Sequence, residues 1–203
     1  IPADPKEENT YFPSVNGNAP YSLLHLNAVY DLLLRTYVDV DLCGRRDWNE
    51  QRSLVKMVDR SSVMKALIIA DRGYESYNLM AHIQEKGWKY LIRIRDIHST
   101  GIISGLDLPE TDEFDMYCPV QITRRKNATT KPLLLDKNRY KWIGPSSPFD
   151  FLPTGAHKHD PVAFYPLPFR VVRFKISDSA YETVITNLDA AEFPPEELKR
   201  LYG

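Results

Sequence analysis

Asp71 is the residue whose type and position most favour chemistry. It directly follows the apolar run of residues 66–70, and Arg72, Gly73 and Tyr74 come next. A carboxylate at a strand end is a suitable ligand for Mg²⁺, a hard cation that protein sites bind through few oxygens. An aspartate in this position can instead cap the helix that follows. The residue type leaves both roles open, and a site for two metal ions would require further acids.

Three other acids lie earlier in the chain and could complete such a site: Asp31, Asp39 and Asp41. Asp39 and Asp41 alternate with the apolar residues at 38, 40 and 42, a pattern typical of the solvent-facing side of a hairpin. We therefore expect Asp39 and Asp41 to face solvent rather than a metal ion.

Other kinds of catalytic site have less support in the sequence. His157 and His159 lie in a loop next to a proline, where a zinc ligand pair and a solvated loop are both open readings, the loop being favoured. Cys43 and Cys118 are far apart and form no CxxC pattern, which disfavours a zinc or redox motif. The chain contains neither GxGxxG nor GxxxxGK[ST], so nucleotide-dependent chemistry is a poor fit.

Basic residues recur on predicted strand faces. Each one alone is explained by ordinary solvation, but together they could follow the phosphates of a nucleic acid. Tyr140 and Trp142 alternate with basic residues and could stack on exposed bases, or pack in the core. The candidate DNA contacts are Arg93, Arg95, Arg124, Arg125, Lys126, Arg173 and Lys175.

The elements around Asp71 are predicted from spacing. Residues 66–70 read as a central strand buried on both faces. Residues 75–86 show helical spacing of apolar residues, and Gly87 stands where a helix C-cap is expected. Residues 88–95 read as a second strand. This order places Asp71 at the carboxyl end of a strand, the edge where ligands bind in open α/β sheets.

The segment before this unit predicts a hairpin and a helix. Residues 1–20 read as a lead-in or loop, and residues 21–34 and 37–42 as two antiparallel strands. Asp47 and Glu50 have the spacing of a capping box, so we expect a helix over 48–60.

The character of the chain changes after Asp96. Residues 97–166 are broken by proline and glycine, with short β-like pieces at 120–123 and 139–143, and we interpret them as a β-rich insertion. Strands are predicted at 169–176 and 181–186. A helix is expected over 194–202, since proline lies in its first turn and glutamates lie near its amino end.

The bulk properties are compatible with many functions. The chain has 203 residues and a formal net charge of −1, so nothing in its total charge attracts nucleic acid or membrane. No apolar run approaches the roughly 20 residues of a membrane span, and a cytoplasmic setting is the default expectation. The predicted fold class is α/β (α+β).

Three segments together resemble one family. The stretch "IIADRGYESYNLMAHIQEKGWKYLIRIRD" (68–96) resembles the second-aspartate block of bacterial insertion-sequence transposases with a DDE active site, of the insertion-sequence-four type. "LLHLNAVYDLL" (23–33) resembles the second strand of that family, and "VITNLDAAEFPPEELKRLYG" (184–203) resembles the approach to its glutamate helix. The resemblance implies a ribonuclease-H-like mixed sheet with flanking helices, interrupted by a β-rich insertion.

The resemblance also implies roles for individual residues. Asp71 matches the second acid of the family, and Arg72, Gly73 and Tyr74 match its signature turn. Tyr202 matches the first residue of the glutamate-helix motif. The first acid is expected before Ile1 and the glutamate after Gly203, so this chain is expected to carry one acid of three and to be inactive alone.

The implied domain division is catalytic core over 1–96, insertion over 97–166, and a return to the core with the start of the glutamate helix over 167–203. The implied activity is DNA strand cleavage followed by strand transfer at element ends, with Mg²⁺ or Mn²⁺ as cofactor. Double-stranded DNA is the implied partner. A homodimer in the synaptic complex and a place in the bacterial cytoplasm at the nucleoid are expected as well. Alternatives are a non-catalytic DNA-binding or scaffold module and a ribonuclease-H-like nuclease without strand transfer.

Overall fold

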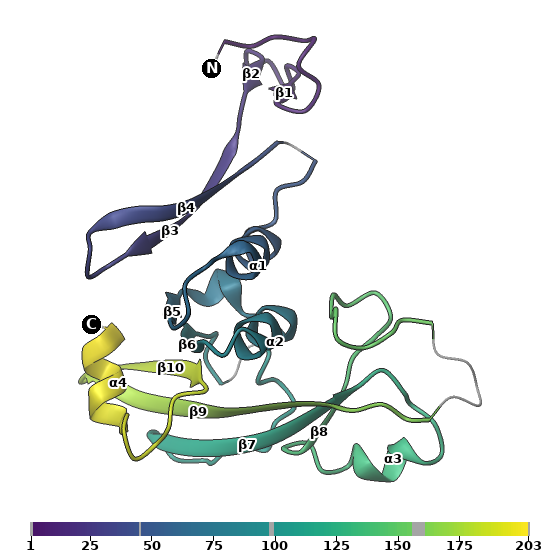
Figure 1. Ribbon diagram of the computed structural model, residues 1–203, viewed down its shortest axis with the longest axis vertical. Helices are drawn as coiled ribbons and strands as arrows, with labels where there is room; N and C mark the ends of the chain where they lie inside the picture. Colours follow the sequence, from purple (N-terminus) through teal and green to yellow (C-terminus); the bar gives the residue numbers. More distant parts are fainter. Residues whose placement is uncertain (1, 45, 98–99, 156–160, 203) are drawn as a thin grey trace. The chain divides into compact units, whose positions relative to one another are not determined.

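The computed structural model describes residues 2–44, 46–97, 100–155 and 161–202 (Figure 1). The chain divides into two compact units, residues 1–62 and residues 63–203, and each is described by itself. His157 and His159 lie outside the described residues. None of the described helices combines the length and the apolar character that a membrane span needs.

The first unit consists of two small antiparallel pairs and one helix. Its elements are β1 (Tyr11–Phe12), β2 (Tyr21–Ser22), β3 (His25–Asp31), β4 (Thr36–Cys43) and α1 (Glu50–Arg60). The predicted hairpin is confirmed as the pair β3–β4. Asp31 shapes its turn, because its Oδ1 accepts hydrogen bonds from the backbone N–H groups of Leu33 and Leu34, each at 2.8 Å. Arg35 completes the turn with a φ of +53°.

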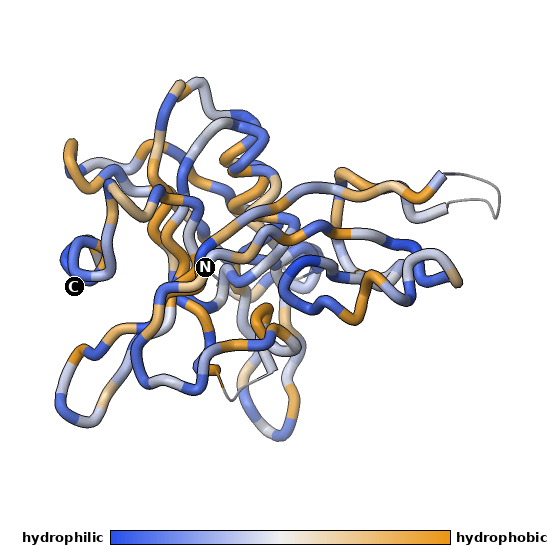
Figure 2. The backbone as a smooth tube through the Cα atoms, turned by 90° about the horizontal axis from the view of Figure 1, so that it is seen from below, coloured by the Kyte–Doolittle hydropathy of each residue, from blue (hydrophilic) through white to orange (hydrophobic). Residues whose placement is uncertain are grey.

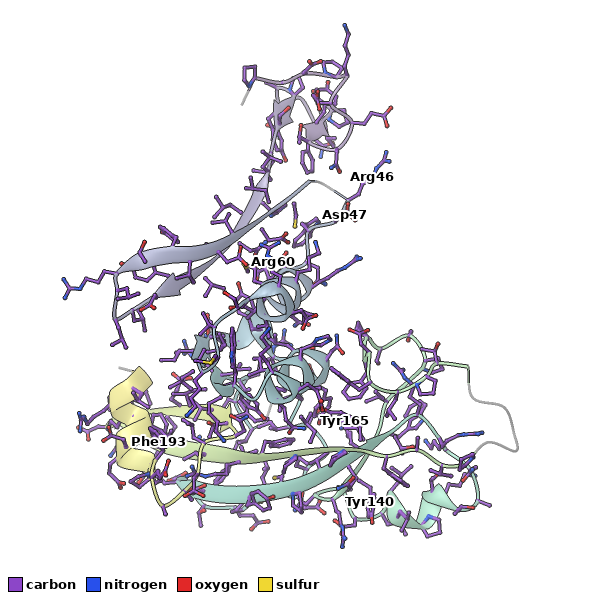
Figure 3. The ribbon with its side chains drawn as sticks, in the orientation of Figure 1. Arg46, Asp47, Arg60, Tyr140, Tyr165 and Phe193 are labelled. Atoms are coloured by element: carbon purple, nitrogen blue, oxygen red, sulfur yellow. The ribbon has the colours of Figure 1, made fainter. Side chains whose placement is uncertain are left out.

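The cap of α1 differs from the prediction. Asn49 is the N-cap, and its Oδ1 accepts from the backbone N–H of Arg52 at 2.8 Å. Asp47 lies in the segment that leads into α1 (Figure 3), so the predicted capping box of Asp47 and Glu50 is wrong. The physical reason is the position in sequence. A capping side chain bonds the N–H group two or three residues further on, and in this helix Asn49 does so with Arg52.

The two faces of the β3–β4 hairpin are also reversed relative to the prediction. Asp39 and Asp41 face α1, whereas the apolar residues at 38, 40 and 42 are exposed. Arg60 binds Asp39 through two nitrogens at 2.7 and 2.6 Å, and Lys56 lies 3.4 Å from Asp41. The two cations of α1 therefore determine which face of the hairpin packs against the helix.

The second unit is built on one mixed sheet of six strands in the order β5-β6-β10-β9-β7-β8. β5 is parallel to β6 and β7 to β8, while the pairs in between are antiparallel. β7 and β9 run side by side as long strands (Figure 1). The strands are β5 (Leu67–Ala70), β6 (Lys89–Arg93), β7 (Phe114–Thr123), β8 (Tyr140–Trp142), β9 (Tyr165–Ser177) and β10 (Ala180–Thr186).

The segment around Asp71 has the predicted order of elements. After β5 comes one 3₁₀ turn, η1 (Arg72–Tyr74), then α2 (Tyr77–Glu85) and β6. The helix starts later than predicted because η1 occupies the intervening residues and Ser76 is the N-cap, its Oγ 3.5 Å from the N–H of Leu79. Gly87 follows the helix with a φ of +72°, a left-handed conformation that favours glycine.

The prediction that β5 is a central strand is wrong for the described sheet. β5 lies at its edge and pairs with β6 alone. Its apolar run is nevertheless explained, since Ile68 is buried and Leu67 and Ile69 pack on a core cluster on the opposite face.

A helix packs against each face of this sheet. On one face lies α4 (Pro195–Tyr202), whose Leu198 is fully buried in a cluster with residues of β6, β9 and β10. On the other face lies α2, with Leu79, Met80 and Ile83 fully buried. Each such side chain contributes about 1.5–3 kcal/mol through burial. The predicted helix over 194–202 is thus confirmed, one residue shorter.

Residues 97–166 contribute two strands to the same six-stranded sheet and one short helix, α3 (Thr130–Leu133). β7 is longer than the predicted piece at 120–123 because nearly its whole length pairs in register with β9, from Phe114 opposite Arg173 to Ile122 opposite Tyr165. Short hydrophobic and hydrophilic stretches are interspersed along the backbone (Figure 2). The division of the chain into core and insertion stays a prediction.

Candidate active site

Asp71 lies immediately after β5 with an extended backbone, φ −84° and ψ 172°. Its Oδ1 accepts a hydrogen bond from the N–H of Arg72 at 2.7 Å, and its carbonyl accepts one from the N–H of Tyr74 at 2.9 Å. Asp71 therefore caps η1, one of its two expected roles. The same side chain is 62% exposed, and its Oδ2 makes no hydrogen bond to the residues that the structure describes. One carboxylate oxygen thus remains accessible.

The strand next to β5 places a guanidinium beside this carboxylate. Ala70 pairs with Ile92 in the parallel register of β5 and β6, so Asp71 and Arg93, one residue further on each strand, are neighbours. Arg93 Nη1 lies 3.8 Å from Asp71 Oδ1. At that separation the two groups attract each other without a direct hydrogen bond.

A second acid holds the other side of Arg93. Glu182 of β10 accepts a hydrogen bond from Arg93 Nε through its Oε1, in a short ion pair. The register explains this contact, because Arg93 pairs with Val184, and Glu182 is two residues away on the same face of β10. Glu182 is only 8% exposed. Asp71, Arg93 and Glu182 form a row across three strands, which we name the charged row.

The predicted signature turn is η1 itself. Arg72 extends from it with its Nε 4.0 Å from Asp71 Oδ1 and its side chain 55% exposed. Gly73 and Tyr74 complete the turn. The signature residues thus form the turn that Asp71 caps.

Glu75, which follows this turn, is hydrogen-bonded to the segment after β6. Its carboxylate accepts hydrogen bonds from the backbone N–H of Arg95, at 3.1 Å, and from that of Ile102. A Cβ at Gly101 would lie 2.5 Å from Glu75 Oε1, so a side chain at this position would require the Glu75 carboxylate to shift. Sequence reasoning placed Glu75 inside the helix and missed this role.

Glu182 was also missed as a site residue. One signal for it exists in the sequence: an acid in the otherwise apolar and β-branched run of residues 181–186. A buried carboxylate requires a partner, but the sequence does not show that the partner is Arg93.

The predicted strand over 88–95 ends at Arg93, so the predicted DNA contact Arg95 follows β6, while Arg173 and Lys175 lie in β9. Arg95 is exposed, and its Nη1 donates to the carbonyl of Thr100 at 3.3 Å. Arg173 is 8% exposed, with its guanidinium 4.4 Å from the ring centre of Tyr181 and its Nε 3.5 Å from Asp96. Lys175 lies 3.4 Å from Asp178.

Of the basic residues after β7, Arg124 binds the loop over residues 144–152. Arg124 donates four hydrogen bonds to backbone carbonyls, at 2.6–3.1 Å, those of Gly144, Ser147, Phe149 and Leu152. Lys126 is exposed above the ring of Trp142, with its Nζ 5.1 Å from the ring centre. Arg125 is partly buried. DNA contact by any of these residues stays a prediction.

Tyr140 was expected either to stack on bases or to pack internally. Its ring meets that of Phe164 edge to face, with the ring centres 5.6 Å apart, and the guanidinium of Arg139 lies 5.6 Å from the centre of the Tyr140 ring. Trp142 remains 38% exposed, and its Nε1 donates to the carbonyl of Arg124 at 3.2 Å.

The donor chemistry of Asp71 fits one ligand of a hard divalent cation, because an exposed carboxylate oxygen is available to it. Among the described residues, no three His, Cys, Asp or Glu side chains form a group that could hold a metal ion. Asp31, Asp39 and Asp41 make the hairpin contacts given above. Tyr202 ends α4 as its last residue. Asp71 alone would therefore bind an ion weakly.

A cavity of about 630 Å³ lies elsewhere, lined in part by Trp88 and Lys89 at the start of β6. Asp71 and Arg93 are at the other, carboxyl end of the paired strands β5 and β6. The charged row is therefore distinct from this cavity.

Comparison with known proteins gives one family. The sequence model of the transposase DDE domain matches residues 5–203. No curated protein matches the sequence. The mixed sheet with a helix on each face agrees with this match and confirms the predicted ribonuclease-H-like α/β class.

Proposed function

We propose, on the premise that this chain belongs to the transposase DDE domain family, that it supplies the second aspartate of a site that cleaves DNA and joins the ends of an insertion sequence to a target. Membership implies DNA as substrate and an enzyme class that cleaves and transfers DNA strands, generally with divalent metal ions. The observation that carries the proposal is Asp71, whose rigid, exposed carboxylate stands at the carboxyl end of β5.

Asp71 has the properties that a metal ligand of such a site needs. Its backbone is fixed by β5 and by the hydrogen bonds of η1, and its Oδ1 is oriented by the N–H of Arg72. The side chain as a whole remains 62% exposed, so the carboxylate is accessible to an ion. A bound Mg²⁺ or Mn²⁺ would activate the attacking water or 3′-hydroxyl and stabilise the leaving oxygen.

The exposed basic residue beside Asp71 would serve the DNA. Arg72 is 55% exposed with its Nε 4.0 Å from Asp71 Oδ1, so a DNA phosphate approaching Asp71 would meet its positive charge. That charge would compensate part of the repulsion between phosphate and carboxylate.

Several finer points are part of this proposal. The element belongs to the insertion-sequence-four type, and the two further acids of the site come from outside the 203 residues, so that this chain alone is inactive. The complete protein acts as a homodimer on paired DNA ends, with Mg²⁺ as its usual ion, in the bacterial cytoplasm. Support for these points comes from the resemblance of residues 68–96 and 184–203 to that type.

The test is a strand-transfer assay on the full-length protein that contains this chain, with Mg²⁺ and DNA that carries the element ends. Asp71→Asn is the decisive variant, because an asparagine Oδ1 can still accept from Arg72 and cap η1 while the negative charge is lost. We expect cleavage and joining to fall to background. Asp178→Asn, in the exposed turn between β9 and β10, is the matched control and should remain active.

The products distinguish the alternatives. Cleavage without joined product would indicate a nuclease of the same fold, and DNA binding without either reaction would indicate a non-catalytic module. An Asp71→Asn protein with wild-type strand transfer would show that Asp71 only caps η1.

A further inference from the structure

The guanidinium of Arg93 lies between two carboxylates that differ in burial and distance. Glu182 is 8% exposed and bonds Arg93 Nε directly, whereas Asp71 is 62% exposed at its side chain and lies 3.8 Å from Nη1. Electrostatic attraction is stronger for the closer and less solvated pair. Most of the charge of Arg93 is therefore compensated by Glu182.

The strand register allows this contact from few positions. Residues 182 and 184 of β10 share the face of Arg93, and residue 184 is a valine in the apolar cluster. Thr183 points to the opposite face. On β9, the partner of Glu182 is Phe174, which belongs to the same apolar cluster. The negative charge that meets Arg93 from β10 is thus that of Glu182.

We infer that Glu182 is a positioning residue of the candidate active site, which holds Arg93 and neutralises much of its charge, so that the Asp71 carboxylate is available to a divalent cation rather than paired with Arg93. This inference rests on the proposed function, in which Asp71 is a metal ligand. It explains why a guanidinium can stand so close to that ligand. Arg72, at 4.0 Å, is more exposed and more screened, so its effect on Asp71 is smaller.

The inference makes two predictions of opposite sign for Glu182→Gln. Without the acid, Arg93 turns its charge to Asp71, so binding of a cation there weakens. The loss of one negative charge beside Arg93 also strengthens binding of DNA phosphates. A purely structural role for Glu182 predicts that both kinds of binding weaken together, because removing one partner of a largely buried ion pair destabilises the sheet.

The experiment uses the 203-residue chain without turnover. Mn²⁺ binding is measured from the electron paramagnetic resonance signal of free Mn²⁺, and binding of a fluorescent duplex is measured by anisotropy at low salt. For Glu182→Gln we expect the Mn²⁺ dissociation constant to rise about five- to tenfold, as one unit charge about 4 Å away produces in an exposed site. DNA affinity should rise about two- to fivefold.

Two controls separate charge from position. Glu110→Gln removes the same charge at an exposed position outside the row and should change neither binding constant appreciably. Arg93→Gln combined with Glu182→Gln removes both partners and should restore Mn²⁺ binding to within about twofold of wild type. Unchanged Mn²⁺ binding in Glu182→Gln, or weakening of both Mn²⁺ and DNA binding, would overturn the inference.

The same series of variants tests whether the proteins fold and whether Asp71 is a metal ligand. If circular dichroism shows that Glu182→Gln is unfolded, Glu182→Asp replaces it; its shorter side chain should give a smaller loss of Mn²⁺ affinity, and no loss would refute the inference. Asp71→Asn should abolish the Mn²⁺ binding that responds to Glu182. If Asp71→Asn leaves Mn²⁺ binding intact, the proposed role of Asp71 fails, and not the pairing of Glu182 with Arg93.

Discussion

Replacing Arg124 by lysine distinguishes a loop-organising role from DNA contact. The guanidinium donates to four carbonyls within residues 144–152, all at 3.1 Å or less. A lysine keeps the positive charge but has one nitrogen in place of three, so it can satisfy about two of these acceptors. Each lost hydrogen bond from a charged donor costs about 1.5 kcal/mol. The loop should then be about 3 kcal/mol easier to open.

Hydrogen exchange measures this opening directly, since amides of a loop that opens locally exchange in proportion to the open population. For Arg124→Lys we expect the amides of residues 144–152 to exchange about a hundredfold faster, with DNA affinity unchanged. Arg200→Lys is the control, because Arg200 is 79% exposed at its side chain and lies far from this loop in sequence, where its Nη1 bonds Glu197 at 3.0 Å. Normal exchange in the loop together with weaker DNA binding would refute the reasoning and make Arg124 a DNA contact.

Two further predictions concern stability. Gly101→Ala should lower the free energy of unfolding by about 1–3 kcal/mol in urea titrations, because a Cβ 2.5 Å from Glu75 displaces a carboxylate that bonds two backbone N–H groups; Gly155→Ala, with no atom within 4 Å, should be nearly neutral. The hydrogen bond from Ser53, with those from Cys43 and Lys56, lowers the pKa of Asp41. The ionised Asp41 carboxylate therefore contributes fully to stability above the unfolded-state pKa of about 3.9. This contribution is lost as the pH falls through the lower pKa of the folded state. Urea titrations should show Asp41→Asn less stable than wild type at pH 7 and the difference vanishing in acid; a constant difference would contradict this assignment.

Local signals in the sequence were sufficient for the elements around Asp71. The apolar run of 67–70, the helical spacing after Ser76 and the glycine at 87 each act over a few residues, and β5, α2 and β6 follow from them. The edge position of β5 does not, because strand order depends on pairings between distant segments.

The features that sequence reasoning missed depend on partners far along the chain. The inward direction of Asp39 is decided by Arg60, 21 residues later, and the first half of β7 is a strand because β9 pairs with it. Glu182 became a site residue only through its contact with Arg93. In each case the residue type was visible, but its partner was not.

The pairing of β6 with β10 also has a consequence for the order of folding. Arg93 and Glu182 are 89 residues apart in sequence, whereas β5, α2 and β6 are consecutive. Closing a long loop costs more chain entropy than closing a short one, and contacts of high sequence separation form slowly. We therefore expect Asp71 and Arg93 to come together early and Glu182 to join them late. During synthesis the nascent chain would then present Arg93 to Asp71 with its charge still uncompensated, and the charge distribution proposed for the finished site would be established only when β10 closes the sheet.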